Sequence, residues 1–242
     1  MPPRVTRRSN GPKACGIALT IDIVPIAEQH IAGFHAVLGR VARQRKYLAI
    51  VEAPPLPAVR EFVLRNIRHG VPQMVALDGD SVVGWCDIVP DARESSRHCG
   101  RLAMGVDPDY RGRGIGSRLM LATLAAAESR GLERIELHVV ETNQVAIRLY
   151  EKFGFEQEGI LRNARKLDGR YEHKIAMSLF LHRPETAGRQ LEETGDAAGA
   201  RECSAGNKMS GTEADGEARR DEALRDEVLG SEPVRRVSAR PR

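Results

Sequence analysis

The sequence RLAMGVDPDYRGRGIGS, at residues 101–117, decides the fold of this chain. Apolar residues alternate through its first half as they do in a strand, and the Asp-Pro pair that starts at 107 ends that strand. A run with glycine at every second position over 112–116 comes next. Apolar residues then recur at helical spacing until Gly131 ends the helix. The predicted order is therefore strand, glycine-rich loop and helix.

The loop and the start of this helix have the properties of a phosphate-binding site. The glycines remove side chains where a ligand must approach the backbone, and the helix directs unpaired N–H groups and its positive dipole end toward the loop. Arg111 and Arg113 add positive charge. A dinucleotide-binding loop needs glycine where Ser117 stands, and a Walker loop needs a lysine that this stretch lacks. A glycine-rich turn without a ligand is the alternative interpretation.

A second motif lies one predicted strand further on, where residues 141–155 read ETNQVAIRLYEKFGF. It is similar to N-x-x-A-x-x-x-Y-x-x-x-G-F, and residues 111–116 fit R/Q-x-x-G-x-G/A. At this separation and in this order of elements, the two motifs resemble the signatures of the GCN5-related N-acetyltransferase (GNAT) family. The resemblance covers residues 17–182. It is specific for the family and for its acyl-CoA cofactor, and it says little about the acceptor.

The resemblance implies an acetyl-CoA site in a V-shaped gap between two parallel strands, and it implies no metal. The pantetheine arm would pair with the backbone of Met104 and Val106, and Asn143 would bond it from the neighbouring helix. Arg111 and Gly112 would shape the loop. The pyrophosphate would accept hydrogen bonds from the backbone N–H groups of Arg113, Gly114, Gly116 and Ser117.

The resemblance also assigns a catalytic role to Tyr150, whose hydroxyl would point at the CoA sulfur and protonate the leaving thiolate. The backbone N–H groups of the strand would polarise the thioester carbonyl. The alternative for Tyr150 is core packing, because Ala146, Leu149 and Phe153 share its helix face. We favour the acid.

The general base is not assigned from the sequence. The acceptor amine arrives as an ammonium ion and must lose a proton before it attacks. Some family members use a carboxylate on the strand before the loop, but residues 102–106 contain none. The candidates are Asp87, Glu141, His98 and a water relay, and each of the three residues also has a structural or solvated interpretation.

The rest of the chain predicts a mixed α/β (α+β) domain with a largely antiparallel sheet of six to seven strands, flanked by helices. By the resemblance, this sheet is splayed at the acetyl-CoA site. Pro25 is expected to begin the first helix, and Asp78-Gly79-Asp80 to turn a hairpin. The strands are expected at 17–23, 73–77, 81–89, 99–106, 134–140, 155–161 and 171–181, and the helices at 26–46, 59–70, 114–130 and 143–153.

Charge and aromatic residues divide the 242 residues unevenly. All ten aromatic residues lie before residue 183, whereas residues 183–242 hold 11 Lys and Arg against 13 Asp and Glu. Residues 183–242 also contain few bulky apolar side chains, and burial of these cannot offset the entropy lost when the segment is ordered. Residues 183–242 are therefore expected to be a disordered charged tail. Residues 1–16 are expected to be a disordered extension, with organelle targeting as the alternative.

Composition also limits the compartment and the partners. The longest apolar runs are far shorter than the roughly 20 residues of a membrane-spanning helix, and the start has no apolar secretory segment. The four cysteines form no C-x-x-C pair, which indicates reduced thiols and a cytoplasmic protein. The mild basicity of residues 1–182 suits a polyanionic ligand and is too weak to indicate nucleic acid. A homodimer is left open.

The resemblance makes the chain an acetyl-CoA-dependent N-acetyltransferase that acts on a primary amine, with a small molecule or amino acid favoured as acceptor. The alternatives are a protein N-terminus or lysine, as in the ribosomal-protein branch of the family, and a non-catalytic acyl-CoA sensor. A charged hairpin turn is the favoured interpretation of Arg162, Arg165, Lys166 and residues 168–174. The alternative is that they border the acceptor slot or contact the CoA phosphates. Trp85 is expected to fill the interface between sheet and helices.

Overall fold

The computed structural model describes residues 20–181, so the expected extension at 1–16 and the expected tail at 183–242 lie outside the described residues. Within the described range the order of strands and helices is the one expected from the sequence. The strands are β1 (Ile21–Pro25), β2 (Gln73–Asp78), β3 (Ser81–Pro90), β4 (Cys99–Val106), β5 (Arg134–Val140), β6 (Glu156–Leu167) and β7 (Arg170–Phe180). The helices are α1 (Ile31–Ala42), α2 (Leu56–Arg68), α3 (Ile115–Ser129) and α4 (Gln144–Lys152), with short 3-10 helices η1 (Glu28–His30), η2 (Glu94–Ser96) and η3 (Pro108–Tyr110).

These strands form one seven-stranded sheet in the order β1-β2-β3-β4-β5-β7-β6. Every neighbouring pair is antiparallel except β4 and β5, which are parallel. The hairpin between β2 and β3 turns through Gly79, whose φ of +57° lies in the region that favours glycine. The expected mixed α/β fold with a largely antiparallel sheet is therefore confirmed.

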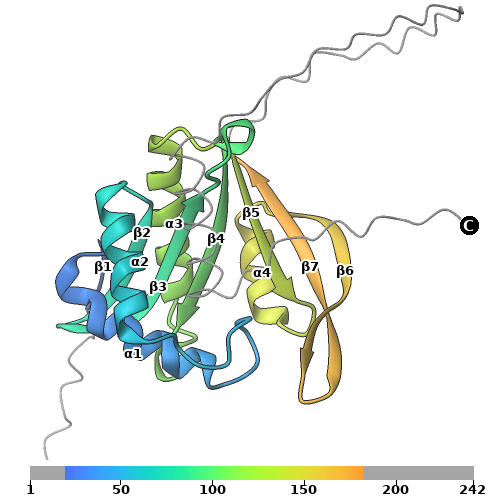
Figure 1. The fold of residues 1–242 in the computed structure, drawn as a ribbon, viewed down its shortest axis with the longest axis horizontal. Coiled ribbons are helices and arrows are strands. Elements are labelled where there is room, and N and C mark those ends of the chain that lie inside the picture. Colours follow the sequence, from blue (N-terminus) through green and yellow to red (C-terminus); the bar gives the residue numbers. More distant parts are fainter. Residues whose placement is uncertain (1–19, 182–242) are drawn as a thin grey trace, which may run out of the picture.

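The parallel pair opens part of the way along its length. Cys99–Arg101 pairs with Arg134–Glu136, and the ladder ends there although β4 runs on to Val106 and β5 to Val140. Figure 1 shows the green β4 and the yellow-green β5 separating toward their lower ends. The facing edges of the two strands thus carry backbone N–H and C=O groups that do not pair across the gap and must bond elsewhere.

Helices cover both faces of the sheet (Figure 1). α1 and α2 pack on one face through a cluster that includes the fully buried Phe34, Phe62 and Trp85. The rings of Phe34 and Trp85 meet edge to face with centroids 5.6 Å apart. Burial of each such side chain contributes roughly 1.5–3 kcal/mol. Trp85 fills the interface between sheet and helices, as expected. α3 and α4 pack on the opposite face, around Leu119 and Ile135.

Helices α1 and α2 cover only the half of the first face that β1 to β4 form. The strand residues in the cluster beneath α1 and α2 come from β1, β2, β3 and β4. On β5, Ile135, Leu137 and Val139 belong to the cluster on the other face, so the residues between them point toward the α1 and α2 side. This half of the sheet therefore presents polar side chains on that face, among them His138, which is exposed.

The first helix begins later than expected. Pro25 is the last residue of β1, where it pairs with Met74, and the Ile26 N–H continues the pairing by donating to the Gln73 carbonyl at 2.9 Å. β1 lies at the sheet edge, where a proline is tolerated because one side of the strand needs no ladder bonds. The helix also ends sooner, and Arg45 soon after it has a positive φ of 56°.

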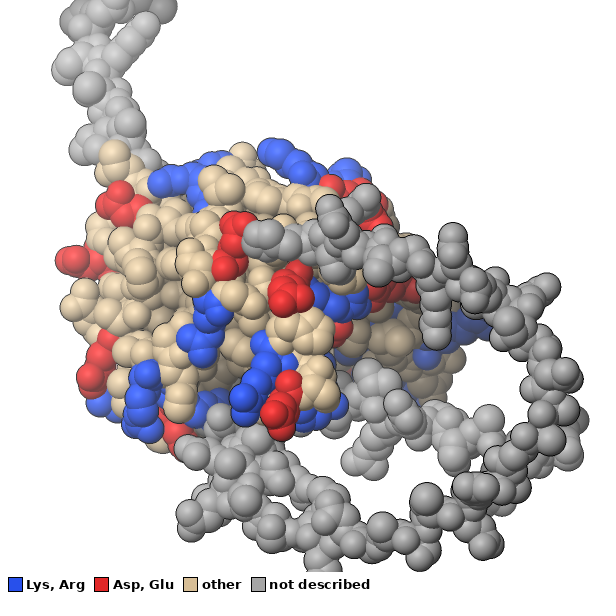
Figure 2. Space-filling view, turned by 90° about the horizontal axis from the view of Figure 1, so that it is seen from above, with Lys and Arg blue, Asp and Glu red and all other residues tan. Residues whose placement is uncertain are grey.

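Two further features of the described residues bear on function. No helix within 20–181 is long and apolar enough to cross a membrane. On the face shown in Figure 2, the visible basic and acidic side chains are interspersed and do not form one continuous basic surface. A continuous basic surface is what binding along a nucleic-acid backbone requires.

Candidate functional site

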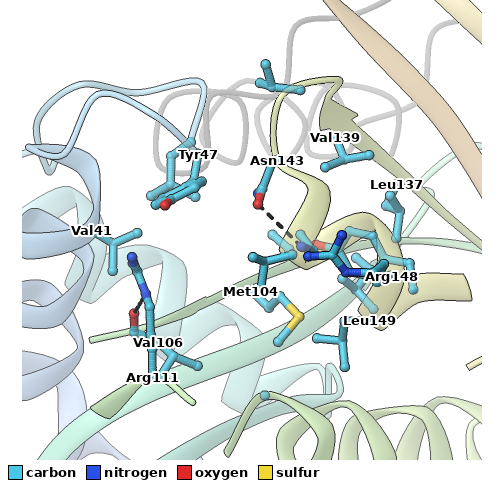
Figure 3. A pocket seen from close by; sticks show the side chains of 18 of the residues that line it. Val41, Tyr47, Met104, Val106, Arg111, Leu137, Val139, Asn143, Arg148 and Leu149 are labelled. Carbon is cyan, nitrogen blue, oxygen red and sulfur yellow. Dashed lines mark hydrogen bonds between the residues drawn. The ribbon is translucent and has the colours of Figure 1, made fainter. Parts of the chain in front are cut away.

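A cavity of about 760 Å³ lies where β4 and β5 diverge. Figure 3 shows Met104 near its centre, with Tyr47 and Arg111 on one side and Asn143 and Arg148 on the other. Apart from Arg113, all the residues predicted to bind acetyl-CoA line this cavity, namely Met104, Val106, Arg111, Gly112, Gly114, Gly116, Ser117, Asn143 and Tyr150. The fold thus gathers residues from two separate sequence motifs around one space.

The glycine-rich loop is anchored by the buried Asp107 at the end of β4. Its backbone N–H donates to the Val83 carbonyl at 2.9 Å, and its carboxylate accepts from the Asp109 N–H at 3.0 Å. The same carboxylate forms an ion pair with Arg40 of α1. The Asp-Pro pair predicted to end the strand therefore also ties the loop to both neighbouring elements.

The loop then reaches α3 through two glycines with left-handed backbone. Gly112 has a φ of +74° and Gly114, the N-cap of α3, a φ of +76°. A Cβ at either position would meet no atom of the described residues within 4 Å. Backbone conformation, rather than crowding by the protein, therefore accounts for glycine here. The space beside this backbone lies next to N–H groups of the first turn of α3, which have no partner within the helix.

The two loop arginines lie differently. The Arg111 Nε donates to the Val106 carbonyl at 3.0 Å, its guanidinium donates to Gln44 at 2.8 Å, and it stacks 4.8 Å from the Tyr47 ring centroid. Arg113 instead donates to the Asp109 carbonyl at 3.0 Å and is not among the residues that line the cavity. Arg111 thus joins the loop to the segment after α1. Any role of Arg113 toward a phosphate is left to its backbone N–H.

Asn143 begins α4. Its side-chain oxygen accepts from the Ala146 N–H at 3.3 Å, which caps the helix. A bond from Asn143 to the pantetheine arm would therefore use the amide nitrogen of this side chain, which is a donor. The Asn143 oxygen would cap the helix while the Asn143 side-chain nitrogen bonds the ligand.

Tyr150 on α4 belongs to the core and to the cavity at once. It is 8% exposed, its ring centroid lies 5.8 Å from that of Phe155, and it lines the cavity. Burial raises the pKa of the Tyr150 phenol, and the neighbouring Cys86 acts in the same direction. The hydroxyl therefore keeps its proton throughout the neutral range, as a proton donor must.

None of the three residues considered as general base from the sequence is among the described residues that line the cavity. Asp87 is fully buried on β3, opposite Ala103 of β4, and Glu141 and His98 also lie outside the cavity wall. The cavity instead contains His138 of β5. His138 is exposed, but partial desolvation still lowers the pKa of its imidazole; the cations Arg101 and Lys174 lower this pKa further, and Glu136 raises it. A lowered pKa favours the neutral imidazole, which is the form that can accept a proton.

Sequence reasoning missed this histidine and the neighbouring cation Arg101, and it gave Lys174 a place at the acceptor slot only as the alternative; both cations line the cavity. His138 stands between Leu137 and Val139, two residues of the apolar cluster on the opposite face. That alternation was a usable signal that the histidine points away from the core. For Lys174 the preferred interpretation of 168–174 as a charged hairpin turn was wrong, and the alternative, a place beside the cavity, fits.

The same interpretation was wrong for Arg165 of β6, which holds the segment after α1 in place. Arg165 is 7% exposed and donates to the carbonyl groups of Arg45 at 2.9 Å and Lys46 at 3.3 Å. It also pairs with Glu172 at 2.8 Å. The next residues of that segment, 47–49, line the cavity. The β6–β7 hairpin therefore positions one wall of the site.

Two further chemistries are limited by the described residues. Within 20–181, no group of three or more His, Cys, Asp and Glu side chains is arranged to hold a metal ion. Cys86 and Cys99 are free thiols, and burial raises the pKa of the Cys86 thiol well above its usual range. A buried thiol that holds its proton is a poor nucleophile.

Comparison with known proteins shows that residues 42–155 match the Acetyltransferase (GNAT) family. The L-amino acid N-acetyltransferase AaaT of Escherichia coli is 36% identical over 115 residues, which are 45% of this chain and 70% of that protein. The mycothiol acetyltransferase of Thermobispora bispora is 43% identical over 72 residues, 29% of this chain and only 24% of that protein. The match to the mycothiol enzyme thus spans about a quarter of its length.

A solved structure of similar fold is the phosphinothricin acetyltransferase of Sinorhizobium meliloti in complex with acetyl-CoA. It superposes with a TM-score of 0.65 over 72% of this chain and 95% of that chain, at 19% sequence identity. At this identity the likeness concerns the fold.

Proposed function

Because the chain belongs to the Acetyltransferase (GNAT) family, we propose that it transfers the acetyl group of acetyl-CoA to the primary amine of a small molecule of the amino-acid kind. One observation carries the proposal. The cavity between the diverging strands joins a left-handed glycine loop and a helix N-terminus to a buried tyrosine and a neutral histidine. The free thiols of Cys86 and Cys99 support a reducing, cytoplasmic compartment.

The residues around the cavity fit acetyl-CoA from end to end. The pyrophosphate takes backbone N–H groups of Arg113, Gly114, Gly116 and Ser117, where the dipole of α3 favours an anion. The open space beside Gly114 leaves room for it. The pantetheine amides lie along β4 at Met104 and Val106, beyond the end of the β4–β5 ladder, where a strand-like partner can complete the pairing.

The reaction then needs two protons removed from the acceptor nitrogen and one supplied to the leaving sulfur. His138 takes a proton from the acceptor ammonium, and the amine nitrogen forms a bond to the thioester carbonyl carbon. Backbone N–H groups of β4 stabilise the oxyanion that forms. The carbon–sulfur bond breaks, and the Tyr150 hydroxyl gives its proton to the departing thiolate. The nitrogen loses its second proton to solvent, and solvent returns a proton to the Tyr150 oxygen. Holding amine and thioester together in a site shielded from water supplies the remaining rate enhancement.

A thiol-release assay with acetyl-CoA and a panel of amines tests the proposal. We expect CoA to appear only when an amine acceptor is present, with one acetyl group added to that amine by mass spectrometry. A thermal shift in acetyl-CoA checks binding separately, because a ligand bound by the native state raises Tm by mass action. Binding without any acetylated product would favour an acyl-CoA sensor instead.

A further inference from the structure

The charged residues of the cavity wall are all basic. None of the described residues that line the cavity is an aspartate or a glutamate. Arg111, Arg148 and Lys152 come from the glycine loop and α4, whereas Arg101 and Lys174 come from β4 and β7. The cavity therefore attracts anions at more than one place.

The second pair of cations lies on the other face of the sheet from α3 and α4. Leu102 and Met104 pack in the cluster beneath α3, so Arg101 points to the opposite face. On β7, Lys174 is two residues from Ala176, the cross-strand partner of His138, and thus shares the face of the histidine. Arg101 lies opposite Glu136 and Lys174 opposite Val140, so the two cations flank His138 at two residues' distance on either side along β5.

Arg101 is also too far from the phosphate end to bind the same anion. Arg101 lies five residues before Val106 in β4. The Val106 carbonyl accepts a hydrogen bond from the loop residue Arg111 and so marks the phosphate end. At about 3.3 Å per residue, that separation along β4 is roughly 16 Å. Arg101 is the last residue of β4 paired with β5, so it lies where the gap closes. A cation there faces the reacting end of the cavity.

Two carboxylates lie near Arg101, and each also pairs with another arginine. Asp91 accepts from the Arg93 Nε at 2.9 Å, and Glu136, across the ladder from Arg101, accepts from the Arg134 Nε at 2.9 Å. Neither carboxylate lines the cavity. Glu136 also acts on His138 and raises the pKa of its imidazole, but Arg101 and Lys174 each act more strongly in the opposite direction.

We propose that the acceptor carries a carboxylate close to its amino group, as a free α-amino acid does, and that Arg101 and Lys174 bind this carboxylate. The inference rests on the proposed acetyl transfer, because it assigns the acceptor end of the same cavity. The amine then lies beside His138, and the carboxylate beyond it. Charge-assisted bonds from a guanidinium and an ammonium group are the ordinary way to bind such an anion.

The proposal separates free amino acids from protein acceptors. In a protein N-terminus the group next to the amine is a peptide amide, which offers no negative charge to the two cations. In a lysine side chain the amine is remote from any carboxylate. Residues 47–49, held by Arg165 through the carbonyl groups just before them, also form a wall at this cavity, which favours a small acceptor.

Matched substrates provide the test. The kcat/KM of the protein is measured with free α-amino acids and with the corresponding amino-acid amides, which keep the amine and lose the negative charge. We expect the acid to be preferred roughly 10- to 100-fold. In Arg101→Gln and Lys174→Gln the KM for the acid should rise by about tenfold or more, and the preference for the acid over the amide should fall by a similar factor. Arg68→Gln, on the exposed end of α2, is the matched control and should keep the preference.

A binding measurement makes the outcome independent of turnover. The same acids and amides are titrated calorimetrically into the protein saturated with CoA, where no acetyl group is available. The acetyl-CoA thermal shift confirms that each variant is folded, and Lys174→Gln serves if Arg101→Gln is not. Turnover of amides as fast as acids would overturn this inference and leave acetyl transfer intact. Carboxylate-dependent binding that Arg101→Gln abolishes, without any turnover, would support the inference and overturn the proposed function. Equal binding of acid and amide would overturn the inference that Arg101 and Lys174 bind a carboxylate.

Discussion

A charge placed at the N-cap of α3 tests where the cofactor's phosphates lie. Gly114 has a φ of +76°, and a Cβ there would meet no described atom within 4 Å. Gly114→Ala therefore adds only backbone strain, about 1–2 kcal/mol for an L-residue in the left-handed region. Gly114→Glu adds the same strain together with a carboxylate at the helix end where an anion is favoured. The comparison of the two variants isolates the charge.

The size of the effect follows from Coulomb's law. A carboxylate at roughly 6 Å from one phosphate charge, with an effective dielectric constant of about 20, costs about 3 kcal/mol. Gly114 is exposed, so salt and water reduce this repulsion to about 1–3 kcal/mol. The expected Kd for acetyl-CoA is then roughly 10- to 100-fold weaker in Gly114→Glu than in Gly114→Ala. Both variants should show a similar fall in Tm without ligand.

Isothermal titration with acetyl-CoA at low and at high salt measures this difference. We expect the gap between the two variants to narrow at high salt, because the repulsion acts through solvent. Equal affinities of the Glu and Ala variants at low salt would refute the reasoning. The pyrophosphate would then have to bind away from the start of α3.

Three further predictions concern other residues. Tyr150→Phe keeps the ring and its contact with Phe155, so acetyl-CoA binding should persist while kcat falls by about 10²–10⁴-fold; an unchanged kcat would make Tyr150 a packing residue. The wild-type kcat/KM should rise with pH as the His138 imidazole loses its proton, at a pKa below its ordinary value because desolvation and the cations Arg101 and Lys174 disfavour the charged form. His138→Gln should lower kcat/KM and remove this rise at the acidic end of the profile. The same rise in the variant would exclude the histidine as base. Deletion of residues 184–242 should leave the far-ultraviolet circular dichroism spectrum and acetyl-CoA binding intact, because both motifs and all aromatic residues precede the cut; an insoluble product would show that those residues complete the domain.

The elements around the two motifs were predictable because local signals agree there. β4 and β5 have the predicted bounds, since alternation marks both strands and Asp107 and Gly131 mark the ends of β4 and α3. Local patterns also placed Asn143 and Tyr150 on one helix. Local agreement of this kind leaves the chain few alternatives.

The parts that failed depend on contacts between distant segments. Pro25 lies in a strand rather than at a helix start because β2, some 50 residues later, pairs with it. Arg165 is buried because it meets carbonyl groups of Arg45 and Lys46, more than 100 residues earlier. Lys174 reaches the cavity only because β7 pairs with β5 out of chain order. Spacing in the sequence carries no information about such pairings.

The protein is proposed to transfer an acetyl group from acetyl-CoA to an amine in the cavity between β4 and β5. The most direct measurement incubates the full chain with isotopically labelled acetyl-CoA and a panel of free amino acids, and follows the label by mass spectrometry. We predict labelled N-acetyl product in equal amount to the CoA released, and none with Tyr150→Phe over the same short interval. Release of CoA without labelled product, or no release while acetyl-CoA still raises Tm, would contradict the claim.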